Sequence, residues 1–141
     1  MFRCIIVMLV ASCSCLFVTG CNESAASDSL VMSYRRTGGM LNLDDYLRIY
    51  ANGRADLSRK GQESTFMIDP DDVTQLITTL DQIPFSSLRS APTAANQGAD
   101  YMQYELRYRQ HTLRMADPEL PGALIPVLED LDGLILNQGQ P

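Results

Sequence analysis

Apolar side chains recur along the chain with two spacings, every second residue and every third or fourth residue. Alternation is typical of half-buried strands, and it occurs in residues 30–36, 46–50, 54–59, 100–109 and 111–116. We predict a β-strand in each of these ranges. In the first of them, the apolar face consists of Leu30, Met32 and Tyr34.

A loop follows the first predicted strand. It begins with Thr37, Gly38 and Gly39, and consecutive glycines permit positive φ values and close approach of the backbone. Met40 and Leu41 complete it. On the residues alone, the glycines do no more than bend the chain between two strands.

Ala51-Asn52-Gly53 joins the second and third strands. With a two-residue turn, Ile49 would lie opposite Asp56, which places polar and apolar side chains on one face. A three-residue loop with Gly53 in the left-handed conformation instead pairs apolar residues on one face and opposite charges on the other. We therefore predict the pairs Ile49–Ala55, Leu47–Leu57 and Arg48–Asp56.

The first helical pattern follows this hairpin. Lys60-Gly61-Gln62 breaks the strand, and residues 65–68 are a short apolar segment that leads into the helix. Asp69 is suited to cap the helix, Pro70 to occupy its first position, and the two aspartates that follow to face its positive end. Pro84 ends the pattern. The buried stripe is predicted to consist of Val73, Leu76, Ile77, Leu80 and Ile83.

A second helix is predicted near the end of the chain. Before it, Phe85 and Leu88 are expected to pack onto the core, and residues 89–99 have the composition of a mobile loop. The second helical spacing runs from about residue 122 to 136, with Pro126 tolerated only in the first turn. Its apolar side consists of Leu124, Leu128, Leu131 and Ile135.

These elements predict an α+β fold, in which an antiparallel sheet of about four to five strands packs against two helices. We place a single domain at residues 30–136 and a polar tail at residues 137–141. Residues 21–29 are small and polar, and we interpret them as a flexible tether.

The first 20 residues have the pattern of a secretory leader. Arg3 gives a positive start, and the uncharged apolar run after it is too short for an ordinary membrane-spanning helix. Val18-Thr19-Gly20-Cys21 resembles the lipobox of bacterial lipoproteins, whose leader is cut before a cysteine that receives a lipid. The resemblance implies that residues 1–20 are a signal peptide and that Cys21 is lipidated. The alternative is an ordinary secretory signal with a chance cysteine.

Lipid on Cys21 would anchor the protein to a membrane, since each buried methylene contributes about 0.8 kcal/mol. Asn22 is not the aspartate that commonly retains lipoproteins in the inner membrane. The expected location is the cell envelope, on the periplasmic side of the outer membrane in a two-membrane bacterium. The remaining cysteines, Cys4, Cys13 and Cys15, all lie in the leader, so we expect a domain without disulfides.

Charge excludes some classes of partner. Without its leader, the chain has 10 basic and 17 acidic residues, a net charge of −7. Nucleic-acid binding depends on cationic contacts to phosphate, and broad docking onto anionic lipid also requires basic residues. We therefore expect no nucleic-acid partner.

Residues that could perform catalysis or hold a metal are few. His111 is the single histidine and has no cysteine beside it, whereas a zinc site needs several such ligands. Asp44 and Asp45 are adjacent in a strand and should point to opposite faces. Asp130 and Asp132 resemble part of a calcium loop, but the spacing to further ligands fails. We predict a protein that is not an enzyme, with no metal and no cofactor.

Several short motifs follow one another in an order that carries a family resemblance. They are Tyr34-Arg35-Arg36-Thr37-Gly38-Gly39-Met40, Asn52-Gly53-Arg54, the Pro70-Asp71-Asp72 helix start, Ala99-Asp100-Tyr101 with Tyr104-Glu105-Leu106, and Leu120-Pro121 with Leu124, Pro126 and Leu128. Together, over about residues 30–135, they resemble emfourin, a family of small bacterial protein inhibitors of thermolysin-like metallopeptidases. The family commonly has an aromatic residue after the double glycine, where this chain has Met40.

The resemblance implies an α+β fold with an antiparallel sheet and helices, and it implies a metallopeptidase as partner. We carry over only the loop from Thr37 to Leu41 as a candidate contact. The first hypothesis is therefore a lipid-anchored envelope protein that binds, and through this loop inhibits, a metallopeptidase. The second is a structural or assembly lipoprotein of the cell envelope without inhibitory activity.

Overall fold

One antiparallel sheet and two α-helices make up the part of the protein that the computed structural model describes, residues 28–90 and 101–138. The α+β prediction is confirmed, with six strands instead of four to five. The elements are β1 Leu30–Gly38, β2 Leu43–Tyr50, β3 Arg54–Arg59, β4 Gln62–Met67, α2 Pro70–Asp81, η1 Phe85–Ser87, β5 Met102–Tyr108, β6 His111–Ala116, η2 Asp117–Glu119 and α3 Ile125–Gln138.

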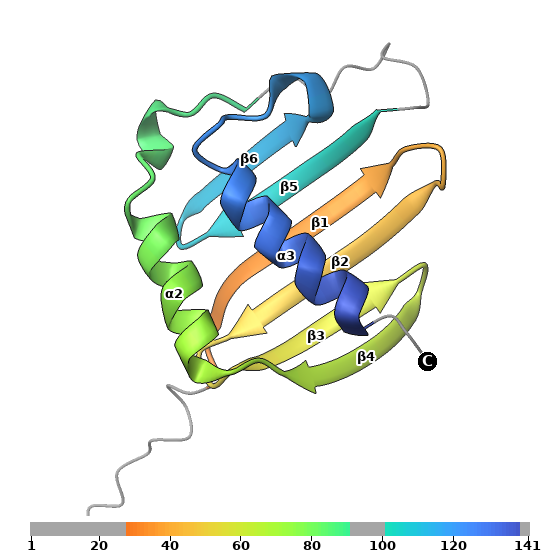
Figure 1. Cartoon of the computed structure of the whole chain (residues 1–141), viewed down its shortest axis with the longest axis vertical. Coiled ribbons are helices and arrows are strands. Elements are labelled where there is room, and N and C mark those ends of the chain that lie inside the picture. Colours follow the sequence, from red (N-terminus) through yellow and green to blue (C-terminus); the bar gives the residue numbers. More distant parts are fainter. Residues whose placement is uncertain (1–27, 91–100, 139–141) are drawn as a thin grey trace, which may run out of the picture.

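The strand order is β4-β3-β2-β1-β5-β6, and every neighbouring pair is antiparallel. β1 is therefore central, between the hairpins β2–β3 and β5–β6. Both helices lie on one face of the sheet, and α3 crosses it diagonally from β6 toward β3 and β4 (Figure 1). Among residues 28–90 and 101–138, no helix covers the opposite face.

The core lies between the sheet and the two helices. Alternate residues of each strand point toward the helices, and most of these are apolar, apart from the buried Arg36 and Asp45 and the polar residues of β4. The fully buried aliphatic side chains include Leu47, Ile49, Leu57 and Leu106 from the sheet and Leu80, Leu131 and Ile135 from the helices.

The two predicted hairpins form, and their registers are now fixed. In the first, the pairs Ile49–Ala55, Leu47–Leu57 and Arg48–Asp56 are those expected for a three-residue loop, and Gly53 has a φ of 83°. The second hairpin has a two-residue turn between Tyr108 and His111.

A missing strand is the main error of the sequence prediction. Residues 62–67 form β4, which pairs with β3 along its whole length, although we expected a break followed by a lead into the helix. Lys60 and Gly61 both have positive φ, 48° and 83°, and form a two-residue turn. β4 was missed because its residues are mostly polar and exposed, as suits an edge strand.

Strand ends also differ from the prediction. A register shift between Leu30 and Met32 removes Leu30 from the apolar face, so that Leu30 is exposed. β1 continues to Gly38 and pairs with β2 from Leu43 onward, so Thr37 and Gly38 belong to a strand and not to the loop.

The helix predictions are mostly confirmed. The Asp69 carboxylate accepts a hydrogen bond from the N–H of Asp71, as expected of a cap. Ile83 is buried but lies beyond the end of α2. The last helix begins at Ile125 and not at about residue 122, which leaves Pro126 in its first turn. It also extends into the predicted tail, to Gln138.

Candidate functional site: the loop between β1 and β2

The predicted binding loop lies at one end of the sheet, where β1 turns into β2. Gly38 is the last strand residue, paired with Leu43, and residues 39–42 make the connection. Met40 and Leu41 are therefore at its tip. We call these two residues the apolar tip.

Two glycines place the loop against the start of β5. Gly38 and Gly39 have φ values of 95° and 68°. A Cβ atom on Gly38 would lie 2.6 Å from the carbonyl oxygen of Tyr101, and one on Gly39 would lie 2.7 Å from the sulfur of Met102. A larger residue at Gly38 would have to displace the backbone before β5, whereas one at Gly39 would meet only the flexible side chain of Met102. The close backbone approach that glycine permits is therefore used at Gly38.

Hydrogen bonds hold the loop backbone from two sides. The N–H of Gly39 donates to the carbonyl oxygen of Tyr101 (3.3 Å), and the N–H of Asn42 donates to that of Gly39 (2.9 Å). On the other side, the ammonium group of Lys60 donates to the carbonyl oxygen of Leu41 (3.3 Å). The tip is thus fixed to β5 and to the β3–β4 turn.

The apolar tip is the most exposed apolar surface of the described residues. Met40 is 90% exposed and Leu41 is 74% exposed. Tyr101, whose carbonyl oxygen accepts from Gly39, is 45% exposed beside them. Contiguous exposed apolar side chains on a fixed backbone are typical of a surface that a partner covers.

A shallow hollow of about 560 Å³ lies next to the loop. Its lining combines a cation and an anion with small polar groups, and consists of Thr37, Gly38, Asn42, Leu43, Asp44 and Lys60. The apolar tip therefore has a polar border, as the rim of a protein contact does.

A buried polar network lies beneath this end of the sheet, on the side of the helices. Arg36 donates to Asp45 (2.8 Å) and contacts Asp132 of α3 (3.0 Å), and Arg59 contacts Asp45 from the other side (3.4 Å). Burial lowers the pKa of Arg36, but the hydrogen bond to Asp45 and the charge of Asp132 outweigh it and raise that pKa. The network ties β1, β2, β3 and α3 together, and no local pattern in the sequence indicates it.

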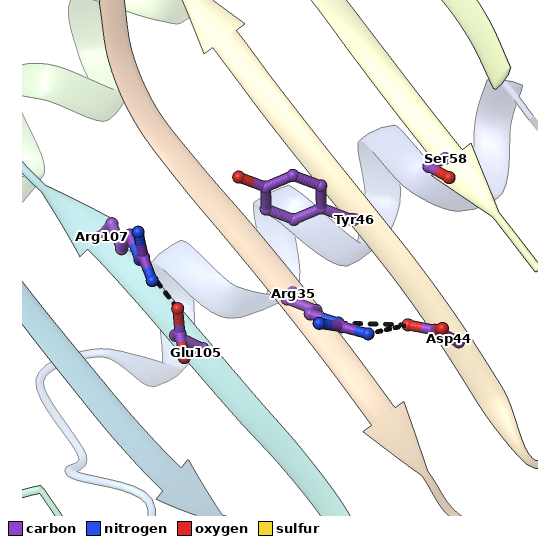
Figure 2. A pocket seen from close by; sticks show the side chains of 6 residues that line it. All are labelled: Arg35, Asp44, Tyr46, Ser58, Glu105 and Arg107. Atoms are coloured by element: carbon purple, nitrogen blue, oxygen red, sulfur yellow. Dashed lines mark hydrogen bonds and ion pairs between the residues drawn. The ribbon is translucent and has the colours of Figure 1, made fainter. Parts of the chain in front are cut away.

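The uncovered face of the sheet carries paired charges. Figure 2 shows Arg35 beside Asp44 and Arg107 beside Glu105, with Tyr46 between the two pairs. Ser58 completes the lining of a hollow of about 300 Å³. Arg114 and Arg107 lower the pKa of Glu105, which burial alone would raise. On this face Arg35 pairs with Asp44 (2.9 Å), and Arg107 and Arg114 both pair with Glu105 (2.8 and 2.9 Å).

The other candidate residues are not brought together. Asp44 and Asp45 point to opposite faces, as predicted. The His111 ring stacks on that of Phe85, with centroids 5.7 Å apart. Asp132 binds Tyr34 and Arg36. Among residues 28–90 and 101–138, no group of three or more His, Cys, Asp or Glu side chains is arranged to hold a metal ion.

The predicted lipid site, Cys21, lies outside the described residues, as do the leader and most of the predicted mobile loop. No helix in the described part of the chain is long and apolar enough to cross a membrane.

Comparison with known proteins gives no further assignment. No protein-family model matches the chain, and searches of curated proteins and of solved structures found no significant match.

Proposed function

We propose that this protein is a lipid-anchored binding module of the cell envelope, and that the apolar tip is its contact with a metallopeptidase partner, which it inhibits. The observation that carries the proposal is the exposure of Met40 and Leu41, 90% and 74%, on a backbone held by hydrogen bonds at both ends. The partner class comes from the resemblance to emfourin.

A fixed loop suits this role for two physical reasons. Binding costs less free energy when the contact is already ordered, because less conformational freedom is lost. Cleavage of a loop by a peptidase requires local opening, and here opening would break the bonds to Tyr101 and Lys60. The loop can thus occupy a cleft while resisting cleavage.

β1 separates the apolar tip from the first residues that the structure describes. β1 runs for nine residues from Leu30 to Gly38, roughly 30 Å at about 3.3 Å per residue. The tip is thus at the opposite end of the sheet from the residues that follow the tether (Figure 1). With lipid on Cys21, the tip would be accessible to a partner in the envelope space.

An inhibition assay tests the proposal. The full chain, processed in bacterial cells and purified in detergent, is titrated against several thermolysin-like peptidases. We expect inhibition by the natural chain and its loss when Met40→Ser and Leu41→Ser are combined. Ile125→Ser is the matched control, because Ile125 is an exposed apolar residue of α3, 41% accessible. Absence of inhibition of every peptidase would remove the inhibitory role and favour the assembly alternative.

A further inference from the structure

The two edge strands of the sheet, β6 and β4, differ in what lies beside them. At β6, the backbone N–H of Arg114 donates to the hydroxyl oxygen of Ser90 (3.2 Å), and His111 stacks on Phe85. The segment after α2 therefore covers the outer side of β6 (Figure 1). At the other edge, β4 pairs only with β3 within the described residues.

The register shows which backbone groups of β4 point outward. Arg59 and Gln62 close a two-residue turn, and such a closing pair exchanges both backbone hydrogen bonds. Every second residue from Gln62 onward therefore bonds to β3. The residues between them direct their N–H and C=O groups away from the sheet, and these are Glu63, Thr65 and Met67.

The same rule applied to β6 agrees with an observed bond. Tyr108 and His111 close the second two-residue turn, so Thr112 and Arg114 should direct their backbone groups outward. The N–H of Arg114 does donate a hydrogen bond outward, to the hydroxyl oxygen of Ser90. The rule thus identifies outward groups correctly at the covered edge.

β4 has few of the features by which exposed edges avoid pairing. Edge strands are commonly interrupted by proline, lysine or a bulge, and residues 62–67 contain none of these. The single charge, on Glu63, lies 3.9 Å from Arg48. Met67 is 66% exposed at the end of the strand.

We propose that β4 pairs antiparallel with β4 of a second copy of this chain, with the two-fold axis at Thr65. Only this register uses all three outward residues of each strand. It places Glu63 opposite Met67 of the partner subunit and no charge opposite a like charge, so the edge is complementary to itself, as an isologous contact requires.

The helix layer supports the same arrangement. The last turn of α3 lies over β3 and β4 (Figure 1), and it carries the exposed Leu136. Pairing of the two edges would bring these turns toward each other on one face of the joined sheet. Apolar contact would then accompany the backbone hydrogen bonds. This surface is separate from the apolar tip.

Cysteine crosslinking in the native envelope tests the pairing. Directly opposed residues of a hydrogen-bonded antiparallel pair have Cα atoms about 5.5 Å apart, which is within the range of a disulfide. Thr65→Cys is made in the full chain, and Thr112→Cys is the matched control at an outward position of the covered edge. The natural chain measures any background from its own cysteines.

After oxidation, Thr65→Cys should give a species of twice the mass that contains two differently tagged copies, whereas Thr112→Cys and the natural chain should not. No excess over the controls, or a crosslink to a different protein, would overturn the proposal. Sedimentation in detergent gives a second measurement that does not depend on the cysteine variant. The natural chain should be a dimer and Thr65→Lys a monomer, and a monomeric natural chain would also overturn the proposal.

Discussion

Tyr34 and Asp132 are 98 positions apart in the sequence and are joined by a hydrogen bond of 2.8 Å from the phenol to the carboxylate. Tyr34 is on the central strand and Asp132 is on the last helix. The same carboxylate contacts the buried guanidinium of Arg36 (3.0 Å). The Asp132 side chain therefore joins α3 to β1, the strand that ends at the candidate loop, through two polar contacts.

Replacing Asp132 should destabilise the fold. Asp132→Ala removes the hydrogen-bond acceptor of the Tyr34 phenol. It also leaves Asp45 as the one remaining carboxylate bound to Arg36 in this network. We expect a loss of about 1–3 kcal/mol in the free energy of unfolding, measured by denaturant titration. Asp130→Ala is the control on the same helix, because Asp130 is exposed and should cost less than about 0.5 kcal/mol. Equal losses in both variants would show that the network has no structural role.

The raised pKa of Tyr34 predicts how the free energy of unfolding changes at alkaline pH. Burial and the negative charge of Asp132 raise its pKa above the ordinary value of 10.0. The folded state therefore retains a proton that the unfolded state loses, so this contribution is complete below pH 10 and is lost as the pH rises further. The free energy of unfolding should fall above pH 10 less steeply in Tyr34→Phe than in the natural chain. Parallel slopes would contradict this assignment.

The loop between β2 and β3 should not tolerate a side chain on Gly53. Its φ is 83°, and an added Cβ would lie 2.6 Å from the carbonyl oxygen of Ile68. Gly61 is a matched control, because it has the same φ but nothing within 4 Å of an added Cβ. Gly61→Ala should cost about 1–2 kcal/mol from the left-handed conformation alone, and Gly53→Ala should cost more. Thermal unfolding measures the stability of both variants. The prediction is contradicted if Gly61→Ala is the less stable of the two.

The sequence predicted elements with a clear period and missed those whose signal is spread over distant residues. The Asp69 cap and the three-residue loop at Gly53 were identified because local geometry and charge agree there. β4 was missed because a polar edge strand has no apolar alternation. The strict alternation at Leu30 was misleading, because a register shift in the strand pairing is not visible in the sequence.

In the candidate site, too, some features have a local signal in the sequence and others depend on distant residues. The loop from Thr37 to Leu41 was carried over from the resemblance to emfourin, and its strongly exposed residues in the structure are Met40 and Leu41. Their fixation by Lys60 and Tyr101 depends on contacts between strands distant in sequence. The opposite charges of Arg36 and Asp45 flank the loop and would have indicated their pairing, had the connection been recognised as a hairpin.

The anchor is tested separately from the domain. We expect the mature protein to begin at Cys21 with lipid on its sulfur, because the lipobox resemblance implies cleavage after Gly20. Mass spectrometry of the protein from its native envelope checks this, and Cys21→Ser should leave the leader uncut. A native product that retains Met1, or one with an unmodified Cys21, would contradict the proposed anchoring.

Photo-crosslinking from the apolar tip in living cells tests the central claim most directly. A benzophenone amino acid replaces Met40 in one strain and the exposed Leu136 in a control strain, and the products are identified by mass spectrometry. We predict one strong adduct between position 40 and a metallopeptidase of the envelope, and no such adduct from position 136. An adduct to the same peptidase from both positions, or an adduct from position 40 to a protein that is not a peptidase, would contradict the account.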